Sequence, residues 1–323
     1  MKKINQNKPT VSVIMPSYNA EKYIAEAIES ILKQSFRDFE FIIINDGSKD
    51  KTLSIIKNYQ KIDNRIKLIE HASNEGLIKS LNDGIKKASG KYIARMDADD
   101  ISLEDRLLIQ VNFLEDNSDI YLVGGSFYCI AENGDIMFTY VNYYNFKTIK
   151  RKLPCKSMIH HPTVMFRNEG QIFYRDKALY CEDRDLWLRF LTEGKKMIVL
   201  SDIVLKYRLD KNSICNSNPE KQRMIMKEVV KWYFERKKGK VESYSNFNLE
   251  NIVNKNKFFS LDYYRERTLL EFAFKTGANR QAFRKNLFVF WKNFGFFSWK
   301  KSLVAYVTSF LPSSIIMKIR TKF

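Results

Sequence analysis

Three carboxylates are crowded into four residues at Asp97, Asp99 and Asp100, shortly after the apolar run Tyr92–Ala94. Carboxylates this close repel one another and are costly to place at a strand end unless a cation or hydrogen-bond donors meet them. Oxygen ligands without cysteine are those that Mg²⁺ or Mn²⁺ takes from proteins while it also binds phosphate. The spacing therefore predicts a metal-assisted phosphate site, and an acidic turn in front of the next helix is the alternative.

Strands that alternate with helices must position these acids. Short apolar runs typical of buried strands lie at residues 11–15, 39–44, 66–69 and 91–96. Helical patterns follow them at residues 23–32, in a polar segment that runs through residue 59, at residues 77–88 and at residues 107–114. This alternation predicts βαβ units and an α/β fold with a mostly parallel central sheet. Ser102 and Asp105 resemble a capping box in front of the last of these helices.

Ligands of a parallel sheet bind at the carboxyl ends of its strands. The polar loops 16–19, 46–48 and 97–99 are therefore expected on one rim. The chain has neither a G-x-G-x-x-G fingerprint nor a P-loop, so a phosphate bound there would depend on a metal ion and on side-chain cations. We predict that Asp99 holds this ion and so stabilises a departing diphosphate.

The same rim offers groups that suit a nucleotide. Lys79 or Arg95 would add positive charge beside the diphosphate. Asp97 would bind a ribose hydroxyl. Asp46, at the end of an apolar strand, would accept the N–H of a pyrimidine ring against which Tyr18 packs.

Five short motifs follow one another along the first 210 residues. They are P-x-Y-N from Pro16, N-D-G-S from Asn45, N-x-G-L from Asn74, R-M-D-A-D-D from Arg95 and E-D-x-D-L-W-L-R from Glu182. With these motifs in this order, roughly residues 9–210 resemble the family 2 glycosyltransferases of the GT-A fold. The resemblance implies a Rossmann-like central sheet and an inverting transferase that takes a sugar from a nucleotide diphosphate, usually UDP, with Mn²⁺ or Mg²⁺.

The resemblance also implies roles for individual residues. Asp183, the second residue of the E-D pair, is implied as the base that deprotonates the acceptor hydroxyl. The implied nucleotide-sugar site contains Pro16, Tyr18, Asn19, Glu21, Asp46, Asn74, Lys79, Arg95 and Asp97. Residues expected to bind the acceptor or to support the site are Glu182, His161, Asp185 and Trp187. Acids at the start of a helix are also favoured by the helix dipole alone, and the two interpretations of residues 182–185 are compatible.

The chain has three histidines, His71, His160 and His161. Adjacent side chains diverge on a strand and no further histidine lies at ligand spacing, so a histidine metal site is not favoured. We expect His161 to contact the acceptor or to make a structural hydrogen bond, and His71 to lie on the surface.

Charge divides the chain into a nearly balanced front and a basic rear. Residues 211–323 contain 23 Lys and Arg against 8 Asp and Glu, and no acid follows Glu271. We therefore expect a nucleotide-sugar transferase domain over residues 1–215 and a helical, basic and aromatic region over residues 216–323.

The basic rear has the composition of a surface that lies in a membrane interface. Eight aromatic residues between positions 283 and 299 interleave with Lys and Arg. The longest uncharged run, 302–317, has 16 residues, fewer than the roughly 20 that span a bilayer. We expect this region to dock a cytoplasmic protein on the inner, anionic face of the plasma membrane. The alternative is that the region is a helical subdomain whose aromatic side chains form its own core. Four cysteines far apart fit a reducing compartment.

The predicted function is transfer of a sugar from a UDP-sugar to a hydroxyl of a glycan or lipid-linked glycan in cell-surface polysaccharide synthesis. A nucleotidyltransferase acting on sugar phosphates is one alternative, but no glycine-rich basic loop follows the first strand. A nucleic-acid-binding protein would explain the net charge of +18, yet three acidic clusters on one rim would repel phosphate without metal, so no nucleic-acid partner is expected. The sequence leaves the sugar, the acceptor, the linkage and the oligomeric state open.

Overall fold

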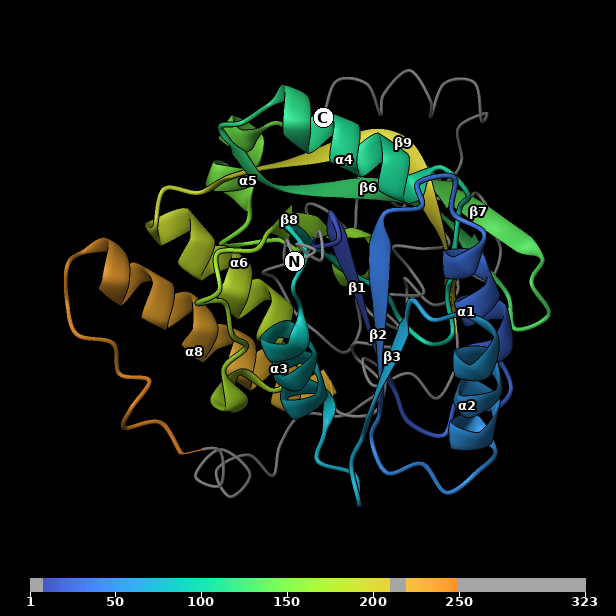
Figure 1. Ribbon diagram of the computed structural model, residues 1–323. Helices are drawn as coiled ribbons and strands as arrows, with labels where there is room; N and C mark the ends of the chain where they lie inside the picture. The colour runs from blue at the N-terminus through green and yellow to red at the C-terminus, as the bar shows by residue number, and fades with distance from the viewer. Residues whose placement is uncertain (1–7, 210–218, 249–323) are drawn as a thin grey trace, which may run out of the picture. The chain divides into compact units, whose positions relative to one another are not determined.

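The computed structural model describes residues 8–209 and 219–248 (Figure 1). Within them the chain forms a mixed sheet of nine strands in the order β3-β2-β1-β4-β8-β6-β9-β5, with β7 paired to β6. The strands are β1 (Val11–Ser17), β2 (Phe39–Asn45), β3 (Ile66–Glu70), β4 (Tyr92–Arg95), β5 (Ile101–Ser102), β6 (Ile120–Ile130), β7 (Ile136–Tyr140), β8 (Met165–Arg167) and β9 (Lys196–Arg208). The α-helices are α1 (Ile24–Leu32), α2 (Thr52–Ile62), α3 (Leu77–Lys87), α4 (Arg106–Asp116), α5 (Phe146–Lys152), α6 (Glu182–Thr192) and α8 (Pro219–Lys237), and the short 3₁₀ helices are η1 (His161–Thr163) and η2 (Asp176–Ala178). The predicted α/β class with a mostly parallel sheet is confirmed.

The strands β1 to β4 are parallel to one another, and β1, β2 and β4 are buried on both faces. Val13 and Met15 of β1 pack in a core with α1, α2 and α4, whereas Ile14, between them, packs in a second core with α3, α6 and α8. Figure 1 shows α1 and α2 on one side of these strands and α3, α6 and α8 on the other. Successive side chains of a strand point to opposite faces, so two covered faces explain why the sequence reads as continuous apolar runs.

The second half of the sheet is built on two long strands. β8 runs antiparallel to β4 and to β6, and β6 runs parallel to β9. A Cβ atom at Gly125 of β6 would lie 2.5 Å from the Val204 side chain, so glycine lets β9 pass close to β6 there. The length of β9 brings its last residue, Arg208, back to the loop that follows β4.

The capping box predicted at Ser102 and Asp105 is wrong. Ser102 lies in β5 and pairs with Leu205 of β9, and the side chain of the N-cap residue Asp105 makes no capping hydrogen bond. Gln34, which follows α1, supplies the cap instead, because its Oε1 accepts the Leu107 N–H at 3.0 Å. A partner 73 residues away in sequence is outside the reach of a local motif.

Helix α8 shares the core of the preceding residues. Trp232 is fully buried in the same apolar cluster as Trp187 of α6, and α8 packs along α6. The domain division near residue 215 stays a prediction, and the basic, aromatic residues 249–323 lie outside the described part of the chain. None of the described helices is long and apolar enough to cross a bilayer.

Candidate active site at the carboxyl edge of the sheet

The loops that follow β1 and β2 are joined by side-chain hydrogen bonds. Asn19 has φ of +47°, a left-handed conformation that asparagine tolerates better than most residues. In this conformation its N–H donates to Ser48 Oγ at 3.0 Å, and its Oδ1 accepts the Lys49 N–H at 2.8 Å. Glu21 makes a similar link by accepting the Lys51 N–H at 2.9 Å. Two of the three predicted loops therefore form one rigid edge.

Two residues just before these links, Pro16 and Tyr18, differ in their exposure to solvent. Pro16 is buried at the end of β1, whereas the next aromatic residue, Tyr18, is 47% exposed. Its ring is therefore accessible to a planar ligand.

Asp46 is buried at the end of β2 and is held by the loop that follows β3. Its two carboxylate oxygens accept the N–H groups of Glu75 and Gly76, both at 2.8 Å. A Cβ atom at Gly47 would lie 2.4 Å from the Ser73 carbonyl carbon, so only glycine at this position lets the loop reach Asp46. Asn74, in the middle of this loop, is exposed.

The expectation that His71 lies on the surface is wrong. Its side chain is only 6% exposed, with Nδ1 2.7 Å from Asp46 Oδ1 and Nε2 3.2 Å from Asp83 Oδ2. Burial follows because the Asp46 loop and α3 close over the end of β3. Lys79 is half exposed on α3, and its ammonium pairs with Asp83 and lies 3.7 Å from Glu75.

Asp97, Asp99 and Asp100 form a compact acidic cluster after β4, with carboxylate oxygens within 4.8 Å of one another. Burial and then the charge of Asp97 raise the pKa of Asp99 to about 6. The same causes, with Asp99 added, raise the pKa of Asp100 well above its ordinary value. Asp100 Oδ2 is buried and has no hydrogen-bond partner among the described residues. Such a donor set fits a divalent cation, whose charge would offset the repulsion.

Arg208, which the sequence interpretation missed, holds the backbone of this cluster. The side-chain Nε of Arg208 donates to the Asp99 carbonyl at 2.8 Å, and the backbone N–H of Arg208 donates to Asp100 Oδ1 at 2.9 Å. The guanidinium also stacks over the Tyr23 ring and pairs with Glu26 at 2.6 Å. Its only sequence signal is a basic residue at the end of an apolar strand, which is common and unspecific.

Arg95 is a buried cation between the acidic cluster and the E-D pair. Burial alone would lower the pKa of Arg95, but its ion pair with Asp97, together with Tyr174 and Asp100, outweighs burial and raises it. The positive charge of Arg95 in turn lowers the pKa values of Asp99, Glu182 and Asp183 from the levels that burial imposes. This one residue therefore couples both groups of acids electrostatically.

Glu182 and Asp183 occupy the first turn of α6. Glu182 is buried, and desolvation followed by the charge of Asp183 raises its pKa to about 7. Asp183 is partly exposed, accepts the Arg184 N–H at 2.6 Å, and has a pKa raised by burial. The acids thus lie where the helix dipole favours negative charge, and Asp183 is the more accessible of the two.

The other residues expected near the acceptor are buried behind this turn. Asp185 is fully buried and accepts from Arg175 Nε at 2.8 Å and from Arg189 Nε at 3.2 Å. Trp187 is 1% exposed and packs against neighbouring aromatic rings. His161 Nε2 lies 2.7 Å from the Tyr174 hydroxyl, and burial lowers the pKa of this histidine well below its ordinary value. These contacts are those of residues that support α6.

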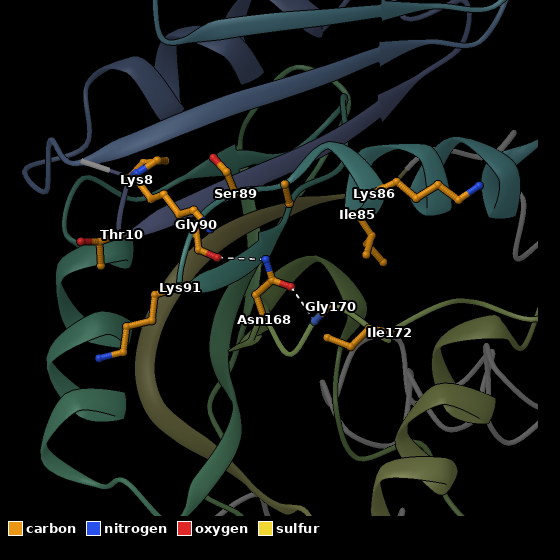
Figure 2. A pocket seen from close by; sticks show the side chains of 12 residues that line it. Lys8, Thr10, Ile85, Lys86, Ser89, Gly90, Lys91, Asn168, Gly170 and Ile172 are labelled. Carbon is orange, nitrogen blue, oxygen red and sulfur yellow. Dashed lines mark hydrogen bonds between the residues drawn. The ribbon is translucent and has the colours of Figure 1, made fainter. Parts of the chain in front are cut away.

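A separate cavity of about 640 Å³ lies at the opposite, amino-terminal edge of the strands (Figure 2). Lys8, Lys86 and Lys91 are among its lining residues. Lys91 is neutralised by Glu115 at 2.6 Å. The nearby N–H groups of residues 89 and 90 already donate to Glu40 and Ser12 side chains. None of the predicted site residues lines this cavity.

Comparison with known proteins gives concordant matches. Residues 12–170 match the model of glycosyl transferase family 2. An uncharacterized glycosyltransferase of Methanocaldococcus jannaschii is 37% identical over 237 residues, which cover 72% of this chain and 82% of the relative. The O-antigen biosynthesis glycosyltransferase WbnJ of Escherichia coli is 37% identical over 211 residues, 63% of this chain and 81% of the relative.

Two solved structures share the fold. Residues 1–349 of TarS from S. aureus, in complex with UDP, align with a TM-score of 0.57 and 18% identity over 93% of this chain and 90% of that one. A mannosyltransferase of Pyrobaculum calidifontis in complex with GDP-Man and Mn²⁺ aligns with a TM-score of 0.54 and 16% identity over 94% of this chain and 86% of that one.

Proposed function

This chain belongs to glycosyltransferase family 2, as its five motifs predicted, and we propose that it transfers a sugar from a UDP-sugar to a hydroxyl of a glycan or lipid-linked glycan with inversion. One observation carries the proposal. Asp46, the cluster of Asp97, Asp99 and Asp100, and the acid pair that begins with Glu182 each have a distinct environment suited to a different part of this reaction. Relatives in polysaccharide biosynthesis support the glycan acceptor.

The donor nucleotide would bind at the edge formed by the first two loops. Asp46 would accept the ring N–H of uracil, and the exposed ring of Tyr18 would pack against the base. Asp97 would bind a ribose hydroxyl, since its carboxylate is partly exposed and pairs with Arg95. The fold relative TarS has been solved with UDP and with UDP-GlcNAc, and the mannosyltransferase with GDP-Man, so these neighbours support a nucleotide-sugar donor, and the proposal of UDP rests on Asp46 and Tyr18.

Asp99 would hold Mn²⁺ or Mg²⁺ with the help of the neighbouring carboxylates. The ion, when bound, supplies positive charge that stabilises the diphosphate leaving group. The unpartnered buried oxygen of Asp100 and the raised pKa of Asp99 support a cation at this place. Arg208 would keep the loop in shape through its contacts to the backbone and to Asp100.

Asp183 would act as the base. It is the partly exposed member of the pair, so it can reach an acceptor hydroxyl, whereas Glu182 is buried beside it. With a pKa of about 7, Glu182 is partly protonated at neutral pH, which limits the negative charge around the base. Inversion follows when a base removes the acceptor proton while the anomeric carbon is attacked opposite the diphosphate.

The basic rear of the chain supports a lipid-linked acceptor at a membrane. Residues 272–323 contain ten Lys and Arg, no Asp or Glu, and the aromatic-rich stretch 283–299. Such a composition favours docking on anionic lipid at the cytoplasmic face of the plasma membrane.

A thermal unfolding screen tests the function directly. UDP and UDP-sugars with Mn²⁺ should raise the melting temperature through linkage, whereas CTP should not. The active donor should then give a product whose anomeric configuration, read by NMR, is opposite to that of the donor. Asp119→Ala, which removes an exposed carboxylate paired with Lys196, is a matched control and should behave as the parent. Stabilisation by CTP but not by UDP would instead favour a nucleotidyltransferase, and a retained configuration would refute inversion.

A further inference from the structure

We propose that His71 is a positioning residue that restricts the donor site to uracil-type bases by occupying one oxygen of Asp46. The inference rests on the proposed role of Asp46 in base recognition. It concerns the three side chains Asp46, His71 and Asp83, which are contributed by the end of β2, the residue after β3 and helix α3.

The contacts of His71 place a donor nitrogen against Asp46. Asp46 accepts two backbone N–H groups, one on each carboxylate oxygen. Oxygens that already accept in this way accept a further hydrogen bond rather than donate one. Nδ1, 2.7 Å from Asp46 Oδ1, therefore donates to it, and Nε2 lies 3.2 Å from Asp83 Oδ2.

The charged groups around this ring alternate in sign. Asp46 faces it from β2, and Asp83 faces it from α3. Two lysines of α3 surround Asp83 in turn, with Lys79 in direct contact and Lys86 at 3.6 Å. Because the ring side chain is only 6% exposed, water cannot replace these contacts easily. The His71 ring therefore fixes the plane of the Asp46 carboxylate.

This arrangement leaves Asp46 with a limited capacity to accept. Oδ1 already takes the His71 and Glu75 protons, so both of its lone pairs are used. Oδ2 takes only the Gly76 proton and has one lone pair left. A uracil ring presents a single N–H between two carbonyls and needs one acceptor. Guanine presents an N–H and an adjacent amino group, which pair best with two free carboxylate oxygens, and cytosine presents an acceptor that Asp46 would repel.

Titration of UDP, GDP, CDP and inorganic pyrophosphate, each with Mn²⁺, tests the proposal by calorimetry. In His71→Ala one oxygen of Asp46 is freed, so the preference for UDP over GDP should fall by roughly tenfold, the effect of one hydrogen bond to a charged group. Pyrophosphate reports the metal site alone and should bind the variant as it binds the parent. CDP should bind weakly to both proteins.

One further variant separates positioning from a general structural role. His71→Asn keeps a donor close to the place of Nδ1 and should retain most of the preference for UDP. Loss of the preference in His71→Asn as well as in His71→Ala would contradict positioning through this one hydrogen bond.

An unchanged ratio of UDP to GDP affinity in His71→Ala would overturn the inference while leaving the proposed function intact. Parallel loss of UDP and pyrophosphate binding would also overturn it, because it would indicate a general disturbance of the rim. A parent protein that binds no UDP at all would refute the proposed function itself, and the inference with it.

Discussion

Replacing Glu182 by glutamine should make the protein more stable at alkaline pH. Glu182 is 7% exposed in the first turn of α6. Burial and then the charge of Asp183 raise its pKa to about 7. The folded protein therefore retains a proton on Glu182 that the unfolded chain has already released, so the free energy of unfolding falls as pH rises through this window. A neutral glutamine cannot show this dependence.

The size of the effect follows from the separation of the two pKa values. The ordinary value of 4.5 and the folded value of about 7 differ by about two and a half units, at 1.36 kcal/mol each, which gives roughly 3 kcal/mol as an upper bound. Near pH 5 the parent and the variant should differ little, whereas near pH 8 the variant should be more stable by about 2–3 kcal/mol.

Urea unfolding at these two pH values measures the difference. Trp187 and Trp232 are both buried, so tryptophan fluorescence should report the transition. The slope of free energy against urea should be the same in both proteins, because the surface exposed on unfolding is unchanged. Comparison with the parent cancels the titration of the other carboxylates, including Asp99.

Asp183→Asn is the matched variant on the neighbouring residue. It removes the second cause of the raised pKa of Glu182 but leaves the first, burial. The pH-dependent loss of stability should therefore become smaller without disappearing. If the parent and Glu182→Gln lost stability in parallel between about pH 5 and pH 8, the buried, protonated state assigned to Glu182 would be refuted.

Four other outcomes are expected. Asp99→Ala should abolish transfer and nearly all metal-dependent UDP binding measured by calorimetry, whereas Asp46→Ala should weaken UDP binding without changing its dependence on metal. Asp183→Asn should keep UDP affinity while transfer falls by roughly 10²–10⁴-fold, and an equal loss of both would place this residue in the donor site. Arg208→Met should weaken Mn²⁺ binding although Arg208 is no ligand, because the variant loses the hydrogen bond from Nε to the Asp99 carbonyl that holds this loop. Unchanged Mn²⁺ affinity would contradict the role of Arg208 in shaping the metal site. Deleting residues 272–323 should release the protein from anionic vesicles. Each basic residue near the surface contributes about 1 kcal/mol, so vesicle binding by the parent should weaken as salt is added. A parent protein that does not bind anionic vesicles at low salt would rule out docking.

The sequence by itself determined the sheet and its edge. Apolar runs at β1, β2 and β4, each followed by a helical pattern, require parallel strands whose carboxyl ends meet. Polar residues placed directly after those runs had to gather there, so the position of Asp46 and of the cluster of Asp97, Asp99 and Asp100 at this edge was predicted from the sequence, whereas their roles stay predictions. These inferences succeed because periodicity and strand ends are local properties of the chain.

Tertiary structure alone decided which of these groups are buried and what holds them. His71 has the sequence surroundings of a surface residue, yet it is enclosed between Asp46 and Asp83. Arg208 reaches Asp99 across 109 positions of the chain, and Gln34 caps α4 across 73. Burial, ion pairing and the pKa shifts at Glu182 and Asp99 depend on which distant segments exclude water from a group, and no local pattern of residues records that.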